Sequence, residues 1–326
     1  MDTALVLFET TEDFRRELTK ILGGYKIVYN ENNGTAAIDA QTAADTTIIF
    51  GNAKPDFLKL CPRLKWVQLG SAGANDFVNG ELNGSVKLTC ASGCYGHAVS
   101  EHMLALTVDL MKKLYLYRDG QPAGSWQSRG SVKSIQGAVV CVIGIGDIGS
   151  NYSKRMKALG AYIIGLDINN YAKPDFLDEF FLLDKLDDVL KRADVVALGV
   201  PGTKNTKGLI GKHQLAQMKK DAILINACRG FIVDTEALCD ALESKSIGAA
   251  GLDVTEPEPL PPEHRLWKQE NVIITPHIAG GRHLKQTGEY ILQLCLRNAG
   301  NFLNNKPLES LVDFQTGFRV PVFPVI

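Results

Sequence analysis

Short apolar runs alternate with helical stretches in two separate series along this chain, and no other feature of the sequence limits the fold as strongly. The second series holds six strand-like runs, several of them apolar at every position: 139–143, 162–166, 195–198, 222–225, 249–253 and 272–275. A strand that is apolar on both faces needs helices on both sides of its sheet, as in a parallel sheet. The second series therefore predicts a doubly wound α/β domain of the nucleotide-binding type.

The first hundred residues show the same alternation. Five strand-like runs are separated by helical segments near 12–22 and 55–61, and the runs are 4–8, 25–29, 47–50, 65–69 and 86–89. This pattern predicts a second parallel sheet. A long helical pattern over 97–117 then joins the two series, and a last helix over 284–304 is expected to return to the first domain. We therefore expect two domains: 1–98 with 291–326, and an inserted domain over 99–290.

Composition narrows the classes of function. The chain has 326 residues, and its 35 basic and 36 acidic residues leave a formal net charge of -1. This balance predicts neither a nucleic-acid partner nor an anionic membrane surface as partner. No apolar run reaches the ~18 residues that span a bilayer, and the start of the chain lacks a basic leader. The seven cysteines are scattered, so we expect a cytoplasmic protein with no metal site.

Three glycines follow the first run of the second series. Gly144, Gly146 and Gly149 lie between the strand-like run 139–143 and a helical stretch over 148–159. In this order the first glycine permits a tight turn, the second lets the backbone approach a pyrophosphate, and the third lets helix and strand pack closely. The alternative is a glycine-rich turn without a ligand. The full context of strand, glycines and helix favours a dinucleotide.

Asp167 ends the next strand-like run, where it is expected to distinguish between cofactors. A carboxylate there accepts hydrogen bonds from the ribose hydroxyls of NAD and repels the 2′-phosphate of NADP. The following residues, 168–170, supply no arginine for that phosphate. We therefore predict NAD as cofactor; the alternative for Asp167 is a solvated side chain at a strand end.

Three polar side chains follow later strand-like runs. Arg229, Glu258 and His277 should converge, because ligands of open parallel sheets bind beyond the carboxyl ends of the strands. Arginine can bind the carboxylate of a 2-oxo acid and polarise its oxo group, while histidine protonates the oxygen as hydride arrives. Glu258 would orient the imidazole and favour its charged form. Two alternatives stay open: Arg229 as a strand-end cap, and Glu256 as the partner of His277. The remaining histidines are expected on helices or the surface: 97, 102, 213, 264 and 283.

These motifs together resemble the D-isomer-specific 2-hydroxyacid dehydrogenases. The resemblance covers nearly the whole chain and is densest over 135–146, Leu266-Trp267 and 271–280. It implies a Rossmann NAD-binding domain inserted into a flavodoxin-like substrate domain. It also implies that Arg229, Glu258 and His277 are the catalytic residues, since the family's glutamate immediately precedes a Pro-Leu pair, as Glu258 does.

The resemblance extends to the binding residues. It implies that the dinucleotide lies along Gly144, Gly146, Asp147, Ile148, Gly149, Asp167, Ala227, Cys228, Arg229, Asp253, His277 and Gly280. Asp253 would lie near the nicotinamide end. The substrate would be held by Arg229, His277 and the loop residues Ser71, Ala72 and Gly73, whose small side chains let backbone N–H groups approach an anion. Residues 70–76 differ from the commoner G-V-G-x-D form of this loop, and Tyr95 either extends the pocket wall or packs in the core.

The sequence thus predicts NAD-dependent reduction of a 2-oxo acid to its D-2-hydroxy acid, or the reverse reaction. The resemblance also implies a homodimer built around the nucleotide-binding domains, with the helix over 97–117 in the interface. The alternative is an NAD-sensing binding protein like the transcriptional corepressors that share this fold. Glyoxylate or hydroxypyruvate, phosphoglycerate and larger 2-oxo acids all remain candidate substrates, although 70–80 offers no basic residue for a phosphate.

Overall fold

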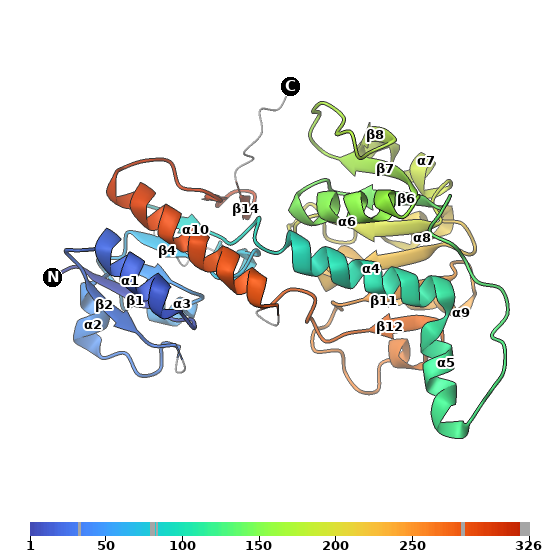
Figure 1. Cartoon of the computed structure of the whole chain (residues 1–326), viewed down its shortest axis with the longest axis horizontal. Helices are drawn as coiled ribbons and strands as arrows, with labels where there is room; N and C mark the ends of the chain where they lie inside the picture. Colours follow the sequence, from blue (N-terminus) through green and yellow to red (C-terminus); the bar gives the residue numbers. More distant parts are fainter. Residues whose placement is uncertain (32–33, 79–81, 83, 282–283, 320–326) are drawn as a thin grey trace. The chain divides into compact units, whose positions relative to one another are not determined.

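The computed structural model describes residues 1–31, 34–78, 82, 84–281 and 284–319. The chain divides into two compact units (Figure 1). The first unit contains Met1–Tyr95 together with the described chain from Gly281 onward, and the second contains Gly96–Gly280. Each unit is built on its own parallel sheet, which confirms the predicted α/β class with two doubly wound sheets.

The first unit has a five-stranded sheet in the order β2-β1-β3-β4-β5, with every pair parallel. This is the flavodoxin-like order. Its strands are β1 (Thr3–Val6), β2 (Lys26–Tyr29), β3 (Thr46–Phe50), β4 (Trp66–Gln68) and β5 (Lys87–Thr89). Its helices are α1 (Glu12–Ile21), α2 (Ala40–Asp45), α3 (Pro55–Leu58), the 3-10 turn η1 (Asn75–Phe77) and α10 (Lys285–Leu303).

Alternate residues of these strands enter two cores, one on each face of the sheet. On one face, Ala4 and Ile48 pack with α1 and α10, whose contributions include Leu18 and Leu294. On the other, residues such as Ile49 pack with α3 and η1. Because α10 follows the second unit in sequence but packs beside α1, the chain returns to the first unit after the second.

The second unit has a seven-stranded parallel sheet in the order β12-β11-β10-β9-β6-β7-β8. The chain starts in the middle of this sheet and reverses direction between β6 and β9, as in a Rossmann fold. The strands are β6 (Val139–Ile143), β7 (Tyr162–Asp167), β8 (Glu179–Leu182), β9 (Val195–Leu198), β10 (Ile223–Asn226), β11 (Ala249–Leu252) and β12 (Val272–Ile274).

Helices cover both faces of this sheet. The helices are α4 (Gly96–Lys112), α5 (Leu114–Gly120), α6 (Asp147–Ala158), α7 (Leu186–Leu190), α8 (Lys212–Gln217) and α9 (Thr235–Glu243). On one face of the sheet, leucines of α4 lie against a glycine of β11, and α4 packs along α6. On the opposite face, the core includes residues of α7, α8 and α9. The short 3-10 turns are η2 (Gln121–Ala123), η3 (Leu183–Lys185), η4 (Gly230–Ile232) and η5 (Arg265–Lys268).

Three local expectations differ from the structure. The single helix predicted over 97–117 is two helices, because Lys113 has a left-handed backbone (φ 56°) between α4 and α5. Two features were not predicted: the edge strand β8, and the hairpin strands β13 (Val312–Asp313) and β14 (Phe318–Arg319) that follow α10. The unit boundaries fall at 95/96 and 280/281, whereas the predicted 290/291 boundary lies inside α10. Residues 320–326 of the predicted first domain lie outside the described residues.

Candidate active site

The carboxyl ends of five strands form one row at an edge of the second sheet. The register pairs Ile143 with Leu198, Leu198 with Asn226, Asn226 with Leu252, and Leu252 with Ile274. At about 4.8 Å between neighbouring strands, the row is roughly 19 Å long. The loops that leave it carry the glycine motif, Arg229, Asp253, Glu258 and His277, so these loops all lie along the edge where ligands of open parallel sheets bind.

The three motif glycines have distinct roles in the loop between β6 and α6. Gly144 has φ 88°, and a Cβ on Gly149 would lie 2.0 Å from the Gly144 carbonyl oxygen, so helix and strand touch there. A Cβ on Gly146 would meet nothing within 4 Å, and Gly146 is the N-cap of α6. The backbone is therefore closely packed at the first and third glycines and open at the second. This arrangement fits a dinucleotide whose phosphates approach the start of α6.

Gly199 completes this packing, and sequence reasoning did not single it out. A Cβ at Gly199 would lie 2.6 Å from the Gly144 carbonyl oxygen and 3.1 Å from the Gly149 Cα. The loop after β9 thus presses directly on the glycine motif. The only sign of this role in the sequence is that Gly199 directly follows an apolar strand.

Asp167 ends β7 and ties the glycine loop to that strand. Its carboxylate accepts hydrogen bonds from the backbone N–H groups of Ile145 (2.9 Å) and Asn169 (3.1 Å), and from the Tyr171 hydroxyl (3.2 Å). Burial, and secondarily the Asp167 charge, raises the pKa of Tyr171, so this hydroxyl remains a donor. Tyr171, which sequence reasoning missed, therefore belongs to the surroundings of the Asp167 carboxylate.

Asp147 and Ile148 occupy the first turn of α6, both half-buried. The Asp147 carboxylate accepts hydrogen bonds from the Gly96 N–H (2.7 Å) and the Asn151 amide (3.1 Å). A Cβ on Gly96 would lie 2.1 Å from that carboxylate. The side chain of Asp147 thus links the starts of α4 and α6, and this contact between distant chain segments was not predicted.

His277 and Glu258 form a close pair. The Nδ1 atom of His277 lies 2.6 Å from Oε1 of Glu258, and both side chains are about two-fifths exposed. A carboxylate that accepts the Nδ1 proton leaves Nε2 to face a reacting group. Glu256, the alternative partner, contributes instead a backbone carbonyl that accepts the Thr235 hydroxyl at 2.8 Å. The structure therefore pairs His277 with Glu258.

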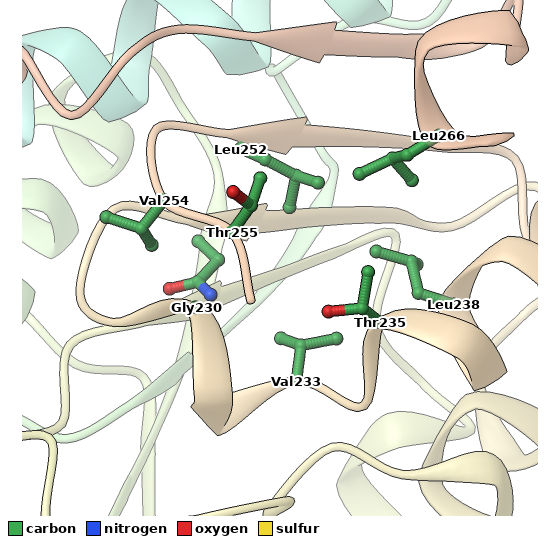
Figure 2. Close-up of a pocket in the computed structure, with 9 residues that line it drawn as sticks. Gly230, Val233, Thr235, Leu238, Leu252, Val254, Thr255 and Leu266 are labelled. Carbon is green, nitrogen blue, oxygen red and sulfur yellow. The ribbon is translucent and has the colours of Figure 1, made fainter. Parts of the chain in front are cut away.

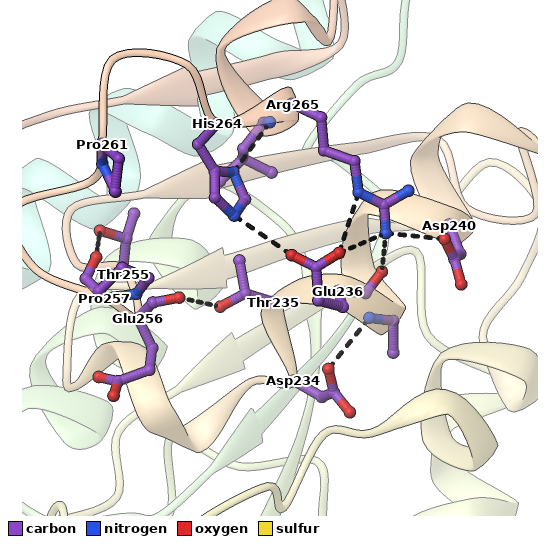
Figure 3. Close-up of polar contacts among 12 residues, drawn as sticks. Asp234, Thr235, Glu236, Asp240, Thr255, Glu256, Pro257, Pro261, His264 and Arg265 are labelled. Carbon is purple, nitrogen blue, oxygen red and sulfur yellow. Dashed lines mark hydrogen bonds and ion pairs between the residues drawn. The ribbon is translucent and has the colours of Figure 1, made fainter.

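Hydrogen bonds to α9 fix the loop that carries Glu258 (Figure 3). The Thr235 hydroxyl of α9 donates to the Glu256 carbonyl of this loop. Within the loop, the Thr255 hydroxyl donates to the Pro257 carbonyl at 2.8 Å. Where the loop ends, Arg265 binds the carboxylates of Glu236 and Asp240, each at 2.8 Å. Glu258 thus lies on a loop attached on both sides to one helix.

Asp253 is 1% exposed, and its carboxylate accepts hydrogen bonds from neighbouring groups of the protein. It accepts hydrogen bonds from the Thr275 hydroxyl (2.6 Å) and from the backbone N–H groups of Ile278 and Ala279 (both 2.9 Å). Its backbone carbonyl accepts the N–H of His277 at 2.8 Å. That Asp253 lies along the dinucleotide stays a prediction; in the structure its side chain organises the loop around His277. Gly280, half-buried, follows that loop at the end of the second unit.

Arg229 lies on the loop after β10 and is half-buried, with one guanidinium nitrogen 2.6 Å from the Cys228 carbonyl oxygen. The next residue, Gly230, packs so tightly that a Cβ would lie 1.8 Å from the Thr255 carbonyl oxygen. Figure 2 shows Gly230 and Thr255 beside one small pocket between these two loops. The loops carrying Arg229 and Glu258 are thus in direct contact.

Ala227 and Cys228, predicted beside the dinucleotide, are both buried. Burial raises the pKa of the Cys228 thiol to about 12, and this thiol donates to the Leu198 carbonyl at 3.0 Å. The sulfur therefore stays protonated and bonded within the protein.

The predicted carboxylate loop belongs to the first unit. Ser71, Ala72 and Gly73 are half-buried, and the Ser71 hydroxyl donates to the Gly73 carbonyl at 2.7 Å. Asn52 holds the loop through the Gly70 N–H (2.9 Å) and the Ser71 hydroxyl (2.8 Å). A pocket of about 340 Å³ at this end of the sheet is lined by Leu7, Phe8, Gly51, Asn52, Gly70, Ser71 and Tyr95.

Asn52 was missed by sequence reasoning, because nothing near it in the chain marks its contact with residue 70. Tyr95 lines the pocket and donates its hydroxyl to the Gly70 carbonyl at 2.5 Å. In the part of the chain that the structure describes, no three His, Cys, Asp or Glu side chains gather into a possible metal site. Over the same residues, no helix has both the length and the apolar character needed to cross a bilayer.

Comparisons with known proteins identify the family of this chain. The family model for the NAD binding domain of D-isomer specific 2-hydroxyacid dehydrogenases matches residues 104–279, more than half of the chain. A glyoxylate reductase from Thermofilum pendens is 33% identical over 231 residues, which cover 69% of this chain and 68% of the relative.

Solved structures give the same result for the fold. A D-isomer specific 2-hydroxyacid dehydrogenase family protein from Aeromonas salmonicida superposes with a TM-score of 0.83 at 28% identity, covering 96% of this chain and 99% of that one. An NADPH-dependent glyoxylate/hydroxypyruvate reductase from Sinorhizobium meliloti, solved with NADP and sulfate, shares the fold with a TM-score of 0.82 at 22% identity, covering 98% and 100%. The chain belongs to the D-isomer specific 2-hydroxyacid dehydrogenases, a family of oxidoreductases, and its second unit has their nucleotide-binding fold.

Proposed function

We propose that this protein reduces a 2-oxo acid to the D-2-hydroxy acid with NADH, and catalyses the reverse reaction with NAD. The observation that carries the proposal is the 2.6 Å pair of His277 and Glu258 on the same sheet edge as the glycine motif. An imidazole held by a carboxylate is a suitable acid and base for an oxo or hydroxyl oxygen. The D configuration follows from the family.

Each of the predicted site residues has its own role in the proposed reaction. Gly144, Gly146 and Gly149 with Asp167 hold the dinucleotide, which when bound supplies or accepts the hydride. Arg229 binds the substrate carboxylate with two N–H groups and polarises the oxo group. His277 donates its Nε2 proton to the oxo oxygen as the carbon gains hydride, and Glu258 stabilises the imidazolium before that transfer. In oxidation, the proton returns from the hydroxyl to His277.

We propose that the backbone of Ser71, Ala72 and Gly73 also binds the substrate carboxylate. In this proposal the first unit is the substrate domain and the second is the NAD-binding domain. Residues 70–80 contain no lysine or arginine, so nothing in this loop favours a phosphorylated substrate. We therefore propose a small, unphosphorylated 2-oxo acid.

A Glu258→Gln variant should lower kcat for 2-oxo acid reduction by about tenfold or more. The carboxylate can only accept and so holds the Nδ1–H of His277 at 2.6 Å, whereas an amide can also donate and fixes the ring less firmly. The measurement is kcat, with Glu256→Gln as the matched control, since the described contact of Glu256 is made by its backbone carbonyl. Wild-type kcat in Glu258→Gln would remove Glu258 from the proposed mechanism.

NADH should be preferred to NADPH by at least about tenfold in kcat/KM, a difference of about 1.4 kcal/mol. The Asp167 carboxylate would repel a 2′-phosphate. The protein from S. meliloti with the same fold was solved with NADP, so the preference has to be measured for this chain. Asp167→Ser should reduce the preference. Equal turnover of both cofactors by the wild type would refute the proposed selectivity.

We also propose a homodimer that uses the segment after α4. Leu114, Tyr117 and Trp126 are exposed there, and Trp126 is 100% exposed. Exposed aromatic side chains near one helix are typical of protein–protein contacts. Light scattering should give about 71 kDa, twice the chain mass of 35.5 kDa. A mass of one chain at working concentration would contradict the dimer.

A further inference from the structure

His102 contacts the loop that carries His277, although it lies on α4, far away in sequence. Its Nε2 atom is 2.9 Å from the Thr275 hydroxyl and 3.6 Å from Oδ1 of Asp253. Its side chain is only 21% exposed. The sequence predicted an ordinary helix or surface histidine here, so these contacts need an explanation.

Hydrogen-bond directions in this group follow from the number of protons. Thr275 has a single hydroxyl proton and donates it to Asp253 at 2.6 Å. The Thr275 oxygen therefore accepts from His102, which places a proton on Nε2 of His102. Asp253 in turn accepts the backbone N–H groups of Ile278 and Ala279. A chain of hydrogen bonds thus runs from His102 through Thr275 to the Asp253 carboxylate, which also accepts from the backbone N–H groups beside His277.

The backbone of His277 needs such support. His277 has φ 54°, a left-handed conformation that is unfavourable for a residue with a Cβ. This conformation is held by the Asp253 carbonyl, which accepts the His277 N–H, and by the bonds from the next two residues to the Asp253 carboxylate. If Thr275 and Asp253 lost their fixed orientation, the imidazole of His277 would lose its own.

We propose that His102 is a positioning residue for the acid–base histidine, acting through Thr275 and Asp253. The inference rests on the proposed function, because it assigns His277 the proton transfer. Attachment of α4 to the sheet does not require His102, since Met103, Leu106 and Leu110 of the same helix are buried. Its polar contact is therefore available for orienting the loop.

The test compares His102→Phe, which cannot donate, with His102→Gln, whose amide can still reach the Thr275 oxygen. We expect His102→Phe to lower kcat about 10- to 100-fold, since a misplacement near 1 Å can cost about 100-fold. The Kd for NADH and the melting temperature should stay near wild type, and His102→Gln should recover most of kcat. His213→Phe is the matched control, because that exposed histidine also bonds an aspartate, Asp187 at 2.8 Å.

Amide hydrogen exchange provides a readout that does not depend on turnover. The amides of Ile278 and Ala279 should exchange faster in His102→Phe than in the wild type, and near the wild-type rate in His102→Gln. A wild type that reduces no 2-oxo acid would refute the proposed function, whereas exchange would still decide the role of His102. Wild-type kcat and exchange in His102→Phe, or a Gln variant as impaired as Phe, would overturn the inference.

Discussion

Replacing His277 with Asn should lower kcat/KM for 2-oxo acid reduction by about 10²- to 10⁴-fold, the usual contribution of a positioned general acid. The asparagine can keep the left-handed backbone of this position, because Asn tolerates that conformation better than most residues. The loss should therefore reflect the missing imidazole rather than a displaced loop. Steady-state kinetics measures the effect, and quenching of protein fluorescence measures NADH binding, which should persist.

His213→Asn is the matched control for this variant. His213 also pairs with a carboxylate in the second unit, but it lies on α8 and is 64% exposed. We expect its activity to equal that of the wild type. A His277→Asn enzyme within a few-fold of the wild type would show that another group transfers the proton.

Gly149→Ala should both destabilise the second unit and abolish cofactor binding. Its Cβ would lie 2.0 Å from the Gly144 carbonyl oxygen and 3.2 Å from Val142, so backbone must move in the cofactor loop. Overpacking of this kind costs about 1–3 kcal/mol and sometimes more, which corresponds to a fall of several degrees in the melting temperature. Thermal unfolding with and without NADH measures both effects.

Gly146→Ala provides the comparison within the same loop. Its Cβ would meet no atom within 4 Å, and its φ of -78° suits alanine. We expect a melting temperature near that of the wild type in the absence of cofactor, but weaker NADH binding, because the added methyl group occupies the open side of the loop. If Gly149→Ala were as stable as Gly146→Ala, the close contact between α6 and β6 would not exist as described.

Much of the second unit was predictable because its signals are local. The fully apolar strands, the glycine motif and the strand-end acid each depend on residues within a few positions of one another. Parallel order then places the ends of β6, β10, β11 and β12 at one edge. For the same reason the loops with Arg229, Glu258 and His277 could be assigned to one edge before any distance was known.

The unpredicted contacts join residues that no local pattern connects. His102 and Thr275 are 173 positions apart, and Gly96 meets Asp147 across 51. The family resemblance places Asp253 along the dinucleotide, which stays a prediction, whereas no local pattern marks the donors to its carboxylate, which come from the following loop. Lys113 interrupts the helix because its backbone is left-handed, and the lysine side chain gives no sign of this conformation in the sequence.

The most direct test of the account is a steady-state assay of the purified protein with NADH and a panel of small, acidic, branched and aromatic 2-oxo acids, followed by chiral chromatography of the product. We predict oxidation of NADH with at least one small, unphosphorylated 2-oxo acid and a product of D configuration. Binding of NADH without its oxidation by any acid of the panel would contradict the account and favour an NAD-sensing binding protein; an L product would contradict the proposed stereochemistry.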